Sequence, residues 1–217
     1  MAIRSSQERR RASGKAIRKV VITGGGCAGK TTFMGLATEV ARERGWTVVT
    51  VPEVPTLVMA NGVGPATRAP FMEFERSVLT LQLTWEESFE RVAESMDGDA
   101  PVLILCDRGI PEIAAYMGYE QYDEILSDAG MTRQDAMETY DAAIHLVSVV
   151  DGAPELYTTE NNKQRYETPE MALRQELRIR ECWDGYARRH VIEADGASFQ
   201  SKMNRAIQVL ESVLDDA

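Results

Sequence analysis

The sequence predicts an α/β domain in which helices cover both faces of a five-stranded parallel sheet, giving a three-layer αβα architecture. Short runs rich in Val, Ile and Leu alternate with longer segments of helical periodicity, a pattern typical of strand–helix–strand units. One run, PVLILC at 101–106, is apolar throughout, as expected of a strand buried on both faces. The 217 residues suit one domain, and neither an internal repeat nor a break in composition indicates a second.

The first expected strand, 19–23, leads through the loop GGGCAGKTT into an expected helix at 31–45. This loop fits the pattern G-x-x-x-x-G-K-[ST] without a mismatch. In that pattern glycines let backbone N–H groups turn inward on phosphates, Lys30 bridges the β and γ phosphates, and the Thr31 hydroxyl ligates magnesium. The alternative is a chance match in a glycine-rich turn, but the flanking strand and helix argue against it. The residues expected to hold a nucleoside triphosphate are Gly24, Gly25, Gly26, Cys27, Ala28, Gly29, Lys30, Thr31 and Thr32.

The second expected strand, 47–51, ends beside a carboxylate, Glu53. Open parallel sheets bind ligands at the carboxyl ends of their strands. We therefore expect Glu53 to contact a substrate, either accepting a proton from a hydroxyl group or holding a metal-bound water. The alternative is a polar strand end that faces solvent. A Gly- and Pro-rich loop at 60–70 is expected near the same site.

A long amphipathic helix is expected at 71–96, where apolar residues recur at alternating steps of three and four. Arg76 lies near its start and is a candidate for binding an anionic group of the substrate, with a surface salt bridge as the alternative. The residues expected to form the buried stripe are Phe71, Phe74, Val78, Leu81, Trp85, Phe89, Val92 and Met96.

The apolar strand 101–106 is followed directly by Asp107 and Arg108. A carboxylate at the tip of a buried strand is the usual partner of a phosphate-binding loop, so Asp107 is expected to bind magnesium directly or through water. The planar guanidinium of Arg108 suits a phosphate or an acidic group of the substrate.

A fourth strand is expected at 140–150, and His145 within it is assigned a structural role. The segment 151–182 is expected to form a lid, because a polar, turn-rich stretch leads into a helix that carries several arginines. Arg165 is the first candidate for a cation that this lid brings to the phosphoryl group during transfer. The alternative is that Arg165 is an ordinary charged residue of the surface.

Thr168 is expected to cap the N-terminus of the lid helix. A last strand is expected at 191–193 and a last helix at 198–214.

Composition limits the classes of partner. The net charge of −10 argues against a broad nucleic-acid surface, and no apolar run reaches the ~20 residues of a membrane helix. The three cysteines, Cys27, Cys106 and Cys182, suggest neither a disulfide framework nor a zinc site, so a reducing, cytoplasmic compartment is expected.

Residues 1–17 form a basic arm that is expected to be flexible. Three interpretations of this arm stay open: a transit peptide, a segment that contacts an anionic surface, and a solvated tail.

Together these motifs resemble one group of phosphate-loop proteins, the AAA-domain ATPases and kinases similar to the nucleotide-kinase part of NadR and to the photoreceptor translocation-defect protein. The resemblance runs from about residue 19 to the C-terminus, and a more distant one joins Glu53, Asp107 and Arg108 to deoxynucleoside and thymidylate kinases. It implies a nucleotide-kinase-like P-loop NTPase fold over 18–217, with strand order 2-3-1-4-5 and a helical lid. The motifs that carry it are GGGCAGKTT, the strand end at Glu53, CDRGIPEIAAY at 106–116, YDAAIHL at 140–146, RYE at 165–167 and FQSK at 199–202.

Two functional classes follow. The first is an ATP- and magnesium-dependent kinase that phosphorylates a small molecule, a nucleoside, a nucleotide or a related metabolite. The second is a regulatory switch that binds ATP or GTP, hydrolyses it slowly and signals to a protein partner. ATP is favoured over GTP because the guanine-specifying N-K-x-D element is absent from the sequence. Neither lipid binding nor an AAA+ ring machine is implied, and a homodimer is left open.

Overall fold

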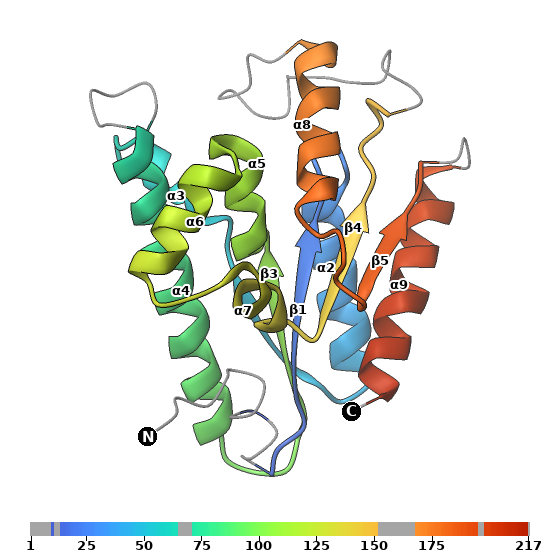
Figure 1. Cartoon of the computed structure of the whole chain (residues 1–217). Coiled ribbons are helices and arrows are strands. Elements are labelled where there is room, and N and C mark those ends of the chain that lie inside the picture. The colour runs from blue at the N-terminus through green and yellow to red at the C-terminus, as the bar shows by residue number, and fades with distance from the viewer. Residues whose placement is uncertain (1–9, 11–13, 65–70, 152–167, 195–197, 217) are drawn as a thin grey trace.

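All five strands pair in parallel in one sheet with the order β2-β3-β1-β4-β5, as expected. Figure 1 shows β3, β1, β4 and β5 in this sheet. The computed structural model describes residues 10, 14–64, 71–151, 168–194 and 198–216. The strands are β1 (Ile17–Thr23), β2 (Thr47–Val51), β3 (Val102–Asp107), β4 (Ala142–Leu146) and β5 (Arg189–Ile192).

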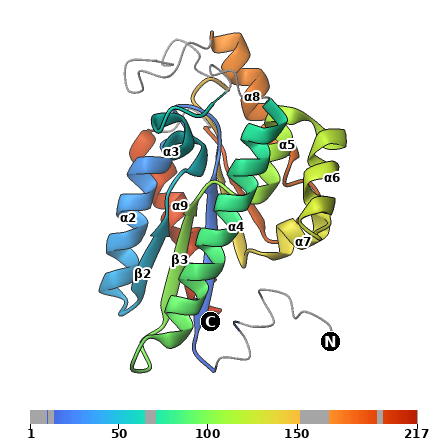
Figure 2. The ribbon, with the colours of Figure 1, turned by 90° about the vertical axis from the view of Figure 1, so that its left-hand side faces the viewer.

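Helices cover both faces of the sheet, which gives the three layers that the sequence predicts (Figure 2). Two helices pack on one face, and the remaining ones lie on the other or at the carboxyl edge of the strands. The first pair is α2 (Lys30–Glu43) and α9 (Phe199–Asp215); the others are α3 (Val54–Ala60), α4 (Phe71–Ser95), the 3-10 turn η1 (Ile110–Ile113), α5 (Ala114–Met117), α6 (Tyr119–Asp128), α7 (Arg133–Glu138) and α8 (Pro169–Glu181).

The alternation of side chains along the strands explains the two cores. In β3, Ile104 and Cys106 face the α4 side while Leu103 and Leu105 face the α2 side, and all four are fully buried. A strand that is apolar on both faces therefore lies in the interior of the sheet, next to β1.

Several expected boundaries shift by a few residues. β1 starts at Ile17 rather than Lys19, and β4 ends at Leu146, well short of the expected 140–150. The cap at Thr168 is confirmed, because its hydroxyl accepts a hydrogen bond from the Met171 N–H at 3.3 Å. None of the described helices is both long and apolar enough to cross a membrane.

The expected buried stripe of α4 is wrong in part. Phe71, Leu81 and Val92 are 40, 39 and 48 % exposed, respectively. Instead, the buried face of the helix includes Glu86 and Glu90, which are 1 and 2 % exposed. The helix extends over nearly the expected residues, but its polar side chains turn inward because a charged residue of the sheet faces them.

That charged residue is Lys19 of β1. Its ammonium group lies 2.6 Å from Glu86 Oε2 and 2.8 Å from Glu90 Oε1. Arg10, within the arm expected to be flexible, is also buried, and its guanidinium lies 2.8 Å from Glu90 and 3.0 Å from Asp141. These five residues form a charge cluster in which each cation contacts two carboxylates; four of them are buried and Asp141 is partly buried.

Replacing Lys19 by Met should lower the free energy of unfolding by about 3 to 5 kcal/mol, because it leaves the buried Glu86 carboxylate without a cation and removes one of the two cations that contact Glu90. Arg91→Met is the control, because Arg91 also lies on α4 but is 65 % exposed. Its nitrogen lies 3.8 Å from the Glu87 carboxylate, so this surface pair contributes little to stability. Urea unfolding of both variants measures the difference. A loss of less than about 1 kcal/mol for Lys19→Met would show that the cluster is not a buried ionic network.

Candidate functional site

The loop between β1 and α2 turns so tightly that glycine is required at both ends. Gly24 has a φ of +131°, and a Cβ there would lie 2.2 Å from the carbonyl oxygen of Leu146 in β4. Gly29 has a φ of +92°, and a Cβ there would lie 2.8 Å from the ring of Phe199 in α9. These two glycines let the loop pass close to β4 and α9 before it enters α2.

The Lys30 side chain folds back over this loop. Its ammonium group donates hydrogen bonds to the carbonyl oxygens of Gly24 at 2.8 Å and Gly25 at 3.0 Å. Burial, and then the nearby charge of Arg108, lower the pKa of Lys30 to about 8, although Asp107 and Glu53 oppose that shift. A triphosphate in the loop would favour the charged ammonium group and raise this pKa again.

Three of the expected site residues, Thr31, Glu53 and Asp107, line one cleft of about 440 Å³ beside the loop. The cleft runs along α2, from Thr31 to Arg42, beside the carboxyl ends of β2 and β3. Its other lining residues are Met34, Gly35, Thr38, Glu39 and Arg42 of α2 and Thr50, Val51 and Pro52 of the β2 end.

Asp107 is suited to act as a magnesium ligand. Its Oδ1 atom is buried and has no hydrogen-bond partner among the described residues. Burial raises the pKa of Asp107, and the charge of Lys30 opposes the rise. The described residues contain no group of three His, Cys, Asp or Glu side chains that could hold a metal ion. Magnesium commonly uses one or two protein oxygens together with phosphate oxygens and water, which suits Asp107 and the Thr31 hydroxyl.

Arg108 is held between two carboxylates. Its Nε donates to Glu53 Oε1, and its Nη1 lies 3.0 Å from Glu112 Oε2. Its φ of +73° is rare for a side-chain-bearing residue, so these contacts hold a strained backbone. Burial alone would raise the pKa of Glu53, but Arg108 and then Lys30 overcome it and lower the pKa to about 2. Glu53 is therefore an ionised acceptor, and Thr56 donates to its Oε2 at 2.9 Å.

The remaining expected residues lie elsewhere or are not described. Arg76 of α4 forms ion pairs with Asp128 and, at 3.4 Å, with Glu124, both on α6. Its role toward a substrate stays a prediction. Arg165 lies outside the described residues, as does most of the segment that precedes α8.

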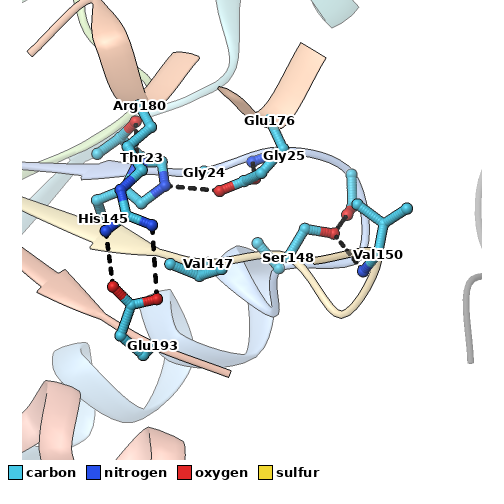
Figure 3. Close-up of polar contacts among 12 residues, drawn as sticks. Thr23, Gly24, Gly25, His145, Val147, Ser148, Val150, Glu176, Arg180 and Glu193 are labelled. Atoms are coloured by element: carbon cyan, nitrogen blue, oxygen red, sulfur yellow. Dashed lines mark hydrogen bonds and ion pairs between the residues drawn. The ribbon is translucent and has the colours of Figure 1, made fainter. Parts of the chain in front are cut away.

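Sequence reasoning missed four residues that position the loop or its neighbour. Glu112 holds Arg108, and Ser148 donates to the Gly26 carbonyl from just beyond β4 (Figure 3). Lys202 of α9 donates to the Ala28 carbonyl at 2.8 Å and to the Val147 carbonyl at 2.5 Å. Glu176 of α8 accepts from the Gly25 N–H at 2.6 Å. A signal existed for two of them, because Glu176 and Lys202 occupy buried positions on the apolar stripes of their helices.

The site combines three features: a glycine loop between a strand and a helix, a buried lysine over that loop, and a carboxylate at the tip of the neighbouring strand. Together they define a P-loop nucleotide-binding fold of the NTPase type. The sheet order agrees with this class. A family model described as an AAA domain matches residues 19–202, and the chain belongs to this family. No curated protein matches the chain. The match includes the whole phosphate loop, Asp107, Glu176 and Lys202.

The lowered pKa of Lys30 predicts how nucleotide affinity depends on pH. Only the protonated ammonium group attracts phosphate, so the affinity for magnesium–ADP should be flat below pH 8. Above pH 8 the affinity should fall, and the steepest fall expected is about tenfold per pH unit. Calorimetric titration between pH 7 and 9.5 measures this dependence.

Lys202 titrates in the same range, because burial lowers its pKa to about 8 as well. The assignment to Lys30 therefore requires that Lys202→Met keeps the fall in affinity and that Lys30→Ala loses it. Constant affinity of the unmodified protein up to pH 9.5 would contradict the burial of Lys30 in the free loop.

Proposed function

We propose that this protein is an ATP- and magnesium-dependent phosphotransferase that acts on a small molecule, namely a nucleoside, a nucleotide or a related metabolite. The observation that carries the proposal is the cleft of about 440 Å³ next to the phosphate loop, lined by Thr31, Asp107 and Glu53. A kinase needs space for an acceptor beside the terminal phosphate, whereas a hydrolytic switch needs space only for water.

The donor side uses the loop and its two strand-end neighbours. The N–H groups of the loop other than that of Gly25, which donates to Glu176, bind the phosphates of ATP together with the Lys30 ammonium group. Thr31 and Asp107 hold magnesium, whose charge offsets the charge of the phosphates. The buried position of Lys30 and the Asp107 Oδ1 atom, which has no hydrogen-bond partner within the described part of the chain, support these roles, because both groups gain an opposite charge when the site is filled.

On the acceptor side, Glu53 orients the attacking hydroxyl. A carboxylate with a pKa near 2 holds a proton poorly, so Glu53 accepts a hydrogen bond rather than acting as a strong base. Phosphoryl transfer through a loose transition state depends on alignment more than on early removal of the proton. Arg108 keeps Glu53 ionised and in place, while Arg165 as the lid cation and Arg76 as an acceptor contact remain further parts of the proposal.

An acceptor screen tests the proposed reaction. ADP release from ATP should rise sharply when the right acceptor is added from a set of nucleosides, nucleotides and phosphorylated metabolites. Lys30→Ala should abolish this rise and weaken ATP binding, while Arg91→Ala, which removes an exposed cation from α4, should leave both unchanged. Slow hydrolysis that no acceptor accelerates would favour the regulatory switch instead.

Asp107→Asn separates metal binding from nucleotide binding. The amide is a weaker magnesium ligand, so magnesium-dependent turnover should drop about 10- to 100-fold while ADP affinity without magnesium changes little. Asp99→Asn is the matched control, because this exposed residue precedes the other end of the same strand. Equal losses of turnover and of metal-free affinity would mean that Asp107 is structural.

A further inference from the structure

Helix α8 reaches the phosphate loop through one fully buried carboxylate, Glu176 (Figure 3). Its Oε2 accepts a hydrogen bond from the Gly25 N–H at 2.6 Å, and its Oε1 lies 2.7 Å from His145 Nε2. His145 is itself fully buried in β4, with its Nδ1 3.5 Å from the Thr23 hydroxyl at the end of β1.

The contact with the loop is direct and tight. A Cβ added at Gly25 would lie 2.6 Å from Glu176 Oε2, so a larger residue there would displace the carboxylate from the loop. Burial would raise the pKa of Glu176, but the hydrogen bond and charge of His145, together with the Gly25 N–H, lower it below the usual value. The carboxylate is therefore ionised and its hydrogen bond to the loop is charge-assisted.

One peptide group of the loop is held from both sides. The N–H of Gly25 and the C=O of Gly24 belong to the same peptide plane, and in a trans peptide they point in opposite directions. Glu176 binds the N–H, and the Lys30 ammonium group binds the C=O at 2.8 Å. The orientation of this peptide thus sets where the Lys30 head group rests, and Glu176 fixes that orientation.

We propose that Glu176 is a positioning residue for nucleotide binding, which acts on Lys30 through the Gly24–Gly25 peptide. This inference rests on the ATP binding of the proposed function and adds a residue that contacts no phosphate. Flanking glycines leave the peptide free to rotate, so without Glu176 the loop samples conformations in which Lys30 is displaced.

The test compares Glu176→Gln with Ile179→Ala. Gln keeps the shape but loses the charge, so the hydrogen bond from the Gly25 N–H is no longer charge-assisted. Ile179 is also fully buried on α8, and its replacement loosens the packing of the helix without altering the carboxylate. We expect the dissociation constant for magnesium–ADP to rise about tenfold in Glu176→Gln and to stay near the original value in Ile179→Ala.

A second measurement follows the loop itself without nucleotide. In protein labelled with ¹⁵N-glycine, the Gly25 amide proton should resonate far downfield and exchange slowly with solvent, because it is buried against a carboxylate. Its signal should move upfield in Glu176→Gln and remain in place in Ile179→Ala.

The outcomes are separable. Unchanged affinity in a folded Glu176→Gln, or equal losses of affinity in both variants, would overturn the proposal. If Glu176→Gln does not fold, a Gly25 amide that exchanges freely in the unmodified protein would overturn it just as directly. Failure of the proposed function is a different result, because it appears as ADP binding that Lys30→Ala leaves intact.

Discussion

The site depends on the parallel pairing of β1 with both β3 and β4. This pairing places Ile22 beside Asp107 and Thr23 beside His145, so three strands end together at one edge. The chain leaves β1 at that edge through Gly24, where the Leu146 carbonyl permits no side chain. One register thus places the phosphate loop, the Asp107 carboxylate and the His145 side chain together, because each follows or belongs to the end of a strand.

Buried charges then fix the helices on this sheet. Lys19 draws the carboxylates of α4 inward, and Tyr140 connects the cluster to the site by donating to Glu86 and accepting from the Ile110 N–H just beyond Arg108. At the carboxyl edge, Glu176 and Lys202 hold the loop from α8 and α9. A buried ion is stable only when its partners are in place. Each of these contacts therefore favours one position of α4, α8 or α9 against the sheet. The nucleotide-binding loop is therefore supported by the last third of the chain as well as by the strand and helix that flank it.

The sequence predicts the features that local chemistry determines. The loop pattern, the apolar run of β3 and the carboxylates at strand ends lie in short segments, and the sheet order followed from the family resemblance. It did not predict the inward charges of α4, because a stripe of Phe, Leu and Val looks buried until Lys19 is known to face Glu86 and Glu90. Nor did it predict the pair of Glu53 with Arg108, which lie 55 positions apart and meet only when β2 and β3 are adjacent. The role of Glu176 has the same origin, since this residue joins α8 to β4 and the loop, whereas the structural role expected for His145 agrees with its complete burial and its contact with Glu176.

Manganese bound with ADP gives the most direct test that magnesium and nucleotide share this edge of the sheet. The paramagnetic ion broadens nearby resonances, so in ¹⁵N-glycine-labelled protein it reports where the metal lies. We predict that the signals of Gly24, Gly25, Gly26, Gly29 and Gly109 disappear, while those of Gly45 and Gly98, at the opposite ends of the strands, persist. Loop signals that survive, or broadening that is strongest at Gly45 and Gly98, would contradict this account.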